Sequence, residues 1–191
     1  MRRAVSFVAS AVAFNEYCIH LKSVPCPRCH LVGHLIRHGY LKGYGKSSQK
    51  DVHRGWRIFC SNRNRQSGCG KTHSVLLVHC LRGRMIQAPH LWCFLQGMLA
   101  GLNPKSAWSK TTSGLSAECG NHLWKAWPVY QMRLRILLCQ LLAPLVCAQS
   151  NPLFEVIVHL QAAFKHAECP ISAFQLHFQR DFLSRDSDAP G

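Results

Sequence analysis

Two cysteine pairs in the first third of the chain limit most strongly how this sequence can fold. Cys26 and Cys29 follow a proline and are separated by two residues, a spacing that forms a tight turn with backbone amides directed at the sulfurs. Cys60 and Cys69 bracket the polar segment SNRNRQSG. Four thiolates satisfy the tetrahedral coordination of Zn²⁺, an ion without redox activity. We therefore predict a Zn²⁺ site formed by Cys26, Cys29, Cys60 and Cys69.

Two alternatives to this ligand set remain open. Eight residues separate the second pair instead of the usual two, so one ligand could instead be His30, His73 or Cys80. All of these thiols could also be free, or buried as small apolar side chains. We favour the four-cysteine site, because it explains the polar residues 62–66 as a loop that the metal holds at both ends.

The segment between the cysteine pairs predicts a small antiparallel sheet. VHRGWRIFC (52–60) alternates, so Trp56 and Ile58 are expected on one face and Arg57 on the other. So small a sheet has a limited apolar core, and a bound metal would stabilise it. Its expected partner strands are 31–38 and 72–79, with the Gly- and Ser-rich residues 39–51 as a connection.

The apolar N-terminus has two interpretations. Arg2 and Arg3 precede an apolar run, and Ala11-Val12-Ala13 resembles the cleavage site of a signal peptide. We favour a buried helix from Phe7 to Leu21, because metal-binding thiolates suit a reducing compartment. No stretch approaches the length of a transmembrane helix, so we expect no membrane association.

The second half of the chain predicts helices that begin at prolines. Asn103-Pro104 and Asn151-Pro152 each supply an Asn cap followed by proline at the first helical position, and Pro128 can begin a helix in the same way. The candidate helices are 89–100, 104–110, 115–127, 128–142, 152–166 and 171–182.

Residues 90–127 have the outline of a helix-turn-helix. In the last of its helices, Cys119 and Leu123 are expected to face inward. Asn121 and Lys125 are expected on the outer face, where such side chains can contact bases or phosphates. A plain helical bundle would give the same pattern, so both interpretations stay open.

Positive charge is concentrated around the cysteines. Residues 22–84 hold thirteen Lys and Arg and a single acid, Asp51, which is +12 of the formal +15 of the chain. A localised basic block favours a nucleic-acid partner. The residues that we expect to contact nucleic acid are Arg37, Lys42, Lys46, Arg54, Arg57, Arg63, Arg65, Lys71, Asn121 and Lys125.

Residues 24–127 resemble a known family. PCPRCHLVGHLIRHGYLKGYG, then RGWRIFCSNRNRQSGCGKTHSVL, then a helical segment with paired tryptophans are similar to the N-terminal zinc ribbon and helix-turn-helix of bacterial insertion-element transposases and their companion DNA-binding proteins. The resemblance implies Zn²⁺ at Cys26, Cys29, Cys60 and Cys69. It also implies that the third helix, 115–127, contacts DNA.

We expect a non-catalytic relative of these transposases. Their catalytic part is an RNase H-like domain that needs three carboxylates around divalent metal ions. No strand-like segments follow residue 127, so two-metal phosphoryl chemistry cannot be assembled there. Neither a glycine-rich phosphate loop nor a GxSxG turn is present. The only acids after residue 127 are Glu155, Glu168, Asp181, Asp186 and Asp188.

These inferences predict an α+β fold, in which a small antiparallel zinc-ribbon sheet precedes a multi-helix domain. The expected function is zinc-dependent binding of duplex DNA in the cytoplasm, associated with the nucleoid, with a possible homodimer through the C-terminal helices. The expected divisions are an N-terminal helix (1–23), a zinc-ribbon-like basic domain (24–84), a helical domain (85–183) and a disordered tail (184–191).

A second hypothesis keeps the metal but changes the partner. The chain could be an RNA-binding or protein-adaptor module in which zinc is only structural. Tyr40, Tyr44 and Trp56 would then be exposed aromatic side chains that stack on unpaired bases. We favour duplex DNA over RNA.

Overall fold

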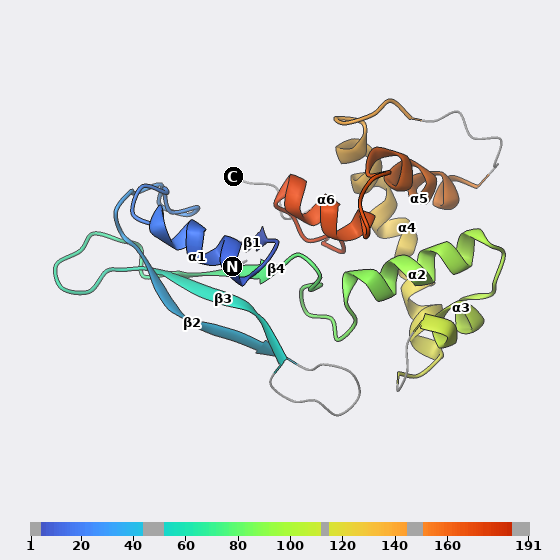
Figure 1. The fold of residues 1–191 in the computed structure, drawn as a ribbon, viewed down its shortest axis with the longest axis horizontal. Helices are drawn as coiled ribbons and strands as arrows, with labels where there is room; N and C mark the ends of the chain where they lie inside the picture. Colours follow the sequence, from blue (N-terminus) through green and yellow to red (C-terminus); the bar gives the residue numbers. More distant parts are fainter. Residues whose placement is uncertain (1–4, 44–51, 112–114, 145–150, 185–191) are drawn as a thin grey trace.

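The computed structural model describes residues 5–43, 52–111, 115–144 and 151–184. The molecule is elongated, with a sheet and one helix at one end and five helices at the other (Figure 1). This is an α+β fold, as the sequence predicts. In chain order the elements are β1 Val5–Val8, α1 Ala11–Ile19, β2 Leu35–Gly43, β3 Val52–Cys60, β4 Thr72–Leu77, α2 Ala88–Leu99, α3 Pro104–Thr111, α4 Glu118–Leu138, α5 Pro152–Ala163 and α6 Pro170–Phe178.

The four strands form one sheet in the order β1-β4-β3-β2. β3 is antiparallel to both β2 and β4, which confirms the predicted pairing. The predicted bounds of the first strand are wrong, because β2 runs over Leu35–Gly43 instead of 31–38, and residues 39–43 pair with β3 instead of belonging to the connection. The register places Arg57 of β3 beside Ser74 of β4, and Phe59 beside Thr72. Paired residues share a face of a sheet, so these four side chains lie on the face that carries Arg57.

The prediction of one N-terminal helix from Phe7 to Leu21 is wrong in its first part. Val5–Val8 forms β1, which pairs in parallel with β4. The apolar run suits a strand because the edge of β4 offers backbone groups for pairing, a partner that local pattern does not reveal. The helix starts only after Ser10, whose hydroxyl oxygen accepts a hydrogen bond from the amide of Ala13 at 3.2 Å.

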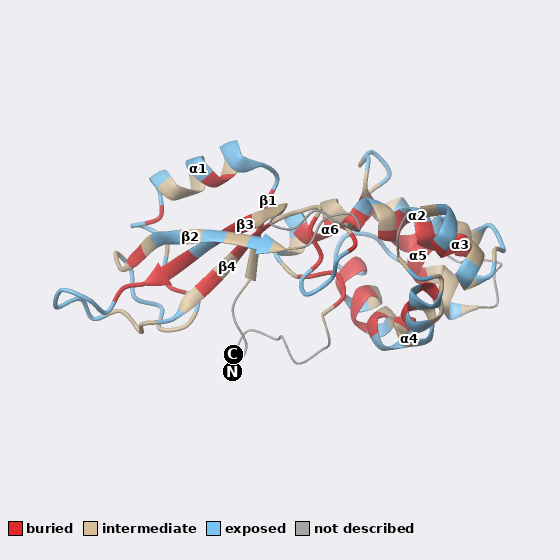
Figure 2. Cartoon of the chain, turned by 90° about the horizontal axis from the view of Figure 1, so that it is seen from below, coloured by how far each residue is buried: buried red, intermediate tan, exposed pale blue. Residues whose placement is uncertain are grey.

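Helix α1 covers one face of the sheet (Figure 2). The Phe14 ring stacks on Trp56, with 4.0 Å between ring centroids and 5° between ring planes. Both side chains are buried, in a cluster that includes Leu35, Ile58 and Val75. The expected alternation of β3 is therefore confirmed, with Trp56 and Ile58 facing inward and Arg57 exposed.

Helix starts in the second half follow the predicted caps. The side-chain oxygen of Asn151 accepts from the amide of Leu153 at 3.0 Å, and that of Asn103 accepts from Ser106 at 2.9 Å. Pro128 is the exception, because it lies inside α4 and the two helices predicted at 115–127 and 128–142 are one. Proline removes one helical hydrogen bond, but Trp127 and Tyr130 are buried in the helical core and hold the helix continuous.

The segment between β4 and α2 joins the sheet to the helices through hydrogen bonds on both sides. From the helical side, the Gln175 amide donates to the carbonyl of Val78 at 2.6 Å, and the Asp181 carboxylate accepts from the amide of Arg82 at 3.0 Å. From the sheet, the Arg54 guanidinium donates to the carbonyls of Leu81 and Arg84. These bonds fix the sheet relative to the helices.

None of the helices in the described ranges combines the length and the apolar character that a membrane span requires.

Substitution of Gly55 tests how closely β3 packs against β4. Its φ is 149°, and a Cβ there would overlap the carbonyl oxygen of Val75. Gly39 in β2 has a φ of 151°, but no atom lies within 4 Å of its Cβ position. Both alanine variants carry similar backbone strain, so the steric overlap distinguishes them. We expect Gly55→Ala to lower the free energy of unfolding by about 1–3 kcal/mol more than Gly39→Ala. Urea unfolding of the metal-loaded protein measures this, and equal losses would contradict the close packing.

Candidate metal centre

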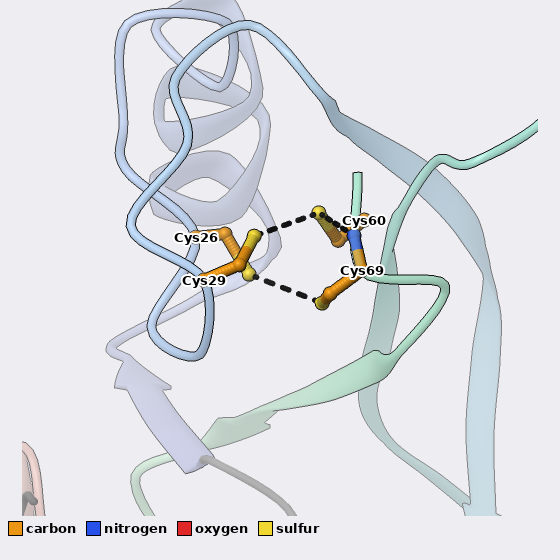
Figure 3. Close-up of side chains that lie close together, drawn as sticks. All are labelled: Cys26, Cys29, Cys60 and Cys69. Carbon is orange, nitrogen blue, oxygen red and sulfur yellow. Dashed lines mark hydrogen bonds between the residues drawn. The ribbon is translucent and has the colours of Figure 1, made fainter. Parts of the chain in front are cut away.

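The structure gathers the sulfurs of all four predicted cysteines at one end of the sheet (Figure 3). The distance from Cys26 Sγ to Cys69 Sγ is 3.7 Å, and that from Cys29 Sγ to Cys60 Sγ is also 3.7 Å. All four sulfurs lie within 4.8 Å of one another. A tetrahedral zinc–thiolate site with bonds of about 2.3 Å has sulfur–sulfur edges of about 3.8 Å. The cluster therefore has the dimensions of a metal site, whereas a disulfide would need about 2 Å.

The first pair is held by a tight backbone turn. The amide of Cys26 donates to the carbonyl of Leu31 at 3.0 Å, and the amide of His30 donates back to the carbonyl of Cys26 at 2.9 Å. His30 adopts a left-handed φ of 59°. The sulfurs accept backbone hydrogen bonds, Cys26 Sγ from Arg28 at 3.4 Å and Cys29 Sγ from Leu31. The turn thus supplies amide donors that stabilise negative charge on both thiolates.

The second pair repeats this turn despite its wider spacing. The amide of Cys60 donates to the carbonyl of Lys71 at 2.9 Å, and the amide of Gly70 donates to the carbonyl of Cys60 at 3.0 Å. Gly70 has a φ of 66°, in the place that His30 takes in the first turn. Cys60 Sγ accepts from the amide of Cys69 at 3.3 Å, and Cys69 Sγ accepts from the amide of Lys71. The two turns therefore share their backbone hydrogen bonds, and in each the first sulfur accepts from an amide near the second cysteine, Arg28 in one and Cys69 itself in the other.

The extra residues of the second pair form a loop that leaves the turn and returns to it. Gly68 lies so close to the start of the loop that a Cβ would overlap the Ser61 carbonyl and come within 2.9 Å of Cys60 Sγ. At the tip, the amide of Gln66 donates to the carbonyl of Arg63 at 3.1 Å. The two residues between them have φ of 52° and 62°, which describes a type I′ turn. We name residues 61–68 the ribbon loop; its residues 62–67 are all exposed.

His73 lies beside the cluster. Its Nε2 is 3.4 Å from Cys26 Sγ, and the side chain is buried in β4. Burial lowers the pKa of His73, and the charge of Arg28 lowers it further, so the ring is neutral at pH 7 and can donate Nε2–H to the thiolate. Among the described residues, the four-sulfur cluster includes none of the alternative ligands His30, His73 and Cys80. The structure therefore favours the four-cysteine set.

The protonation of the thiols depends on their surroundings. The amide of Leu31 lowers the pKa of Cys29 to about 7, so this thiol is ionised in part at neutral pH. Burial raises the pKa of Cys60 to about 12 and also raises that of Cys69. A metal ion that binds all four sulfurs must therefore displace protons from Cys60 and Cys69.

The residues predicted to contact nucleic acid have different surroundings in the structure. Lys46 lies outside the described residues. Arg54 uses its guanidinium in the hydrogen bonds to Leu81 and Arg84, and Asn121 is half-buried and donates to Glu118 at 2.9 Å. The remaining members of the set are exposed: Arg37, Lys42, Arg57, Arg63, Arg65, Lys71 and Lys125.

The sequence does not predict the surroundings of Phe59 or the position of His73. The guanidinium of Arg63 lies over the Phe59 ring, with Cζ 5.3 Å from the ring centroid, and His38 packs near the same ring at 5.3 Å between centroids. The sequence gives no signal that the His73 ring lies where it can donate a hydrogen bond to Cys26 Sγ. In α4, Cys119 is exposed, contrary to the inward position predicted for it.

Comparison of the chain with protein-family models, with curated proteins and with solved structures finds no match.

Replacing one ligand tests the centre directly. We expect Cys26→Ser to lose stoichiometric metal and to unfold the sheet, because three thiolates leave the ion incompletely coordinated and the small core depends on it. Elemental analysis and circular dichroism measure the two effects. Cys93→Ser is the control, since Cys93 is exposed on α2. Full metal content in Cys26→Ser would contradict the site.

The raised pKa values of Cys60 and Cys69 predict that metal affinity falls as the pH falls. At least two protons are released on binding, so the logarithm of the apparent association constant should rise by two or more per pH unit between pH 6 and 8. Competition with a chromophoric chelator at several pH values measures this slope. An affinity that does not change over this range would show that these thiols are not ligands.

Proposed function

We propose that this protein is a non-catalytic, zinc-dependent DNA-binding protein, comparable to the transposase-associated factors that its sequence resembles. The observation that carries the proposal is the position of the ribbon loop. The loop lies directly between Cys60 and Cys69 of the cysteine cluster, and its exposed tip carries Arg63 and Arg65. A closed four-thiolate site suits zinc and leaves no open coordination position for chemistry, so the metal has a structural role.

Contacts within the chain give the ribbon loop a defined shape. The second cysteine turn holds its ends, the type I′ turn holds its tip, and the Arg63 guanidinium lies over the Phe59 ring. Arg65 occupies a left-handed conformation that costs a non-glycine residue about 1–3 kcal/mol. Ordered guanidinium groups lose less conformational entropy when they contact phosphates than those of a free chain do. This argues for an anionic ligand at the tip.

Neighbouring cations extend the same surface. Arg57 lies exposed on the sheet face that also carries Phe59, and Lys71 is exposed where the second turn enters β4. Each phosphate that such residues neutralise releases counterions, so affinity should fall steeply with salt. The formal charge of +12 in residues 22–84 supports a phosphate backbone as the partner.

Helix α4 offers fewer contacts than the sequence predicts. Glu118 at its start pairs with Lys105 of α3 and accepts a hydrogen bond from Asn121. A carboxylate at this position disfavours phosphate, and it occupies the Asn121 side chain. Lys125 stays exposed. We therefore assign the main DNA contact to the ribbon loop and a lesser one to the first half of α4.

The aromatic side chains argue for duplex DNA over unpaired RNA. Trp56 is 3% exposed and stacks on Phe14, so the prediction that it is free to stack on bases is wrong. Tyr44 lies outside the described residues. Tyr40 is exposed, but its hydroxyl accepts a hydrogen bond from Arg37 at 2.8 Å. Binding of duplex DNA is also the basis for the expected nucleoid location.

Deleting residues 62–67 separates the metal from the DNA contact. The deletion leaves Cys60-Ser61-Gly68-Cys69, which has the two-residue spacing of the first pair, so we expect full zinc content. Removal of Arg63 and Arg65 should weaken binding to duplex DNA about tenfold or more at low salt. It should also reduce the slope of log affinity against log salt by about 1.8. Fluorescence anisotropy with a labelled 20-bp duplex measures both.

The control removes two positive charges elsewhere. Lys110→Gln with Lys165→Gln changes two exposed cations in the helical half and should leave affinity nearly unchanged. Undiminished affinity in the loop deletion would contradict the assigned contact. Single-stranded RNA in the same assay decides the partner, because equal affinity for both would leave only non-specific electrostatics. If the zinc-loaded wild-type protein fails to bind the duplex at 50 mM salt, the proposed function is wrong.

A further inference from the structure

One face of α4 is apolar and exposed in its second half. Val129, Met132 and Ile136 are 50%, 57% and 61% exposed, and Cys139, which continues the helical backbone as its cap, is exposed as well. We name these four residues the α4 stripe. Their spacing of three, four and three residues keeps them on one side of a helix, as in the seam of a coiled coil. The opposite side of α4 is buried in the helical core.

The α4 stripe is neutral in a strongly basic chain. Arg135 beside it pairs with Glu155 at 3.0 Å, and the neighbouring Gln131 and Gln140 carry no charge. The next cation on the same side, Lys125, lies one turn before Val129. Such a face offers no positive charge to the phosphates of a nucleic acid, whereas contiguous exposed apolar side chains mark a protein interface. A second copy of a chain of charge +15 can approach most closely where that charge is absent.

We propose that the α4 stripe pairs with the same stripe of a second copy, with the two helices antiparallel. The three-four-three spacing reads the same from both ends, so a two-fold axis between Met132 and Ile136 matches every position. Val129 then faces Cys139 of the partner subunit, and Met132 faces Ile136 of the partner subunit. A parallel pair would continue the seam to Lys125 against its own copy, which places like charges opposite each other.

This dimer goes beyond the proposed function, because its formation depends on neither zinc nor nucleic acid. It gives each assembly two ribbon loops, and linked binding sites raise the affinity for a ligand that can span both. Loss of DNA binding in the experiments above would leave the dimer untouched, and a monomeric protein would leave single-loop binding untouched.

A single introduced thiol tests the antiparallel register. In a background with Cys93, Cys119 and Cys147 replaced by serine, Val129→Cys should give a covalent dimer on oxidation with diamide, through Cys139 of the partner subunit. Adding Cys139→Ser should abolish that dimer. The matched control is Val12→Cys on α1, where the parent valine is 67% exposed, and it should stay monomeric on a denaturing gel. A dimer that forms through Cys139 alone would overturn the antiparallel arrangement.

The oligomeric state in solution tests the α4 stripe without a cross-linking reaction. Light scattering at 100 µM should give twice the chain mass for the wild type, and Ile136→Glu should return it to one chain. Ile19→Glu on α1, where the parent side chain is 76% exposed, should remain dimeric. A wild type that is monomeric at this concentration, together with no cross-link for Val129→Cys, would overturn the proposal.

Discussion

The structure of the sheet and of helix α1 depends on the contact between two cysteine turns. Four strands and one helix provide a small apolar core around Phe14 and Trp56, and much of the remaining chain there is loop. The turns bring together sulfurs from segments about forty residues apart, Cys26 and Cys69. Each sulfur accepts a backbone amide, so the turns are built for thiolates and for the cation that thiolates attract.

The same turns connect stability to the proposed DNA contact. The ribbon loop is an extension of the second turn, so whatever holds Cys60 and Cys69 also holds the ends of the loop. The sulfurs face one another, where they could hold a metal ion, and the arginines of the loop are exposed to solvent. Stability and the proposed recognition would therefore depend on one site but on different residues. The six additional residues between the second pair act on the surface and leave the backbone scheme of the turn unchanged.

The helical half contributes a rigid platform and, in our proposal, a second copy. Its connection to the sheet consists of backbone carbonyls that accept from Arg54 and Gln175, together with the Asp181 carboxylate. Charged and polar side chains are thus engaged in contacts within the protein. A basic residue in this chain is therefore not necessarily available to a ligand. Arg54 is the clearest case. It belongs to the basic block of the sequence, but in the structure its guanidinium binds the segment between β4 and α2 that connects the sheet to the helices.

Local sequence pattern was sufficient to predict part of this structure. The sequence by itself predicted the group of four cysteines, the pairing of three antiparallel strands and the Asn-capped helix starts, because cysteine spacing, alternation and caps act over a few neighbouring residues. Only the tertiary structure decided that Val5–Val8 is a strand on β4, that α4 continues through Pro128, and that Trp56 is buried. It also decided that the widened cysteine pair repeats the first turn. Each of these outcomes depends on contacts between residues distant in the chain, whose free energy outweighs local preference.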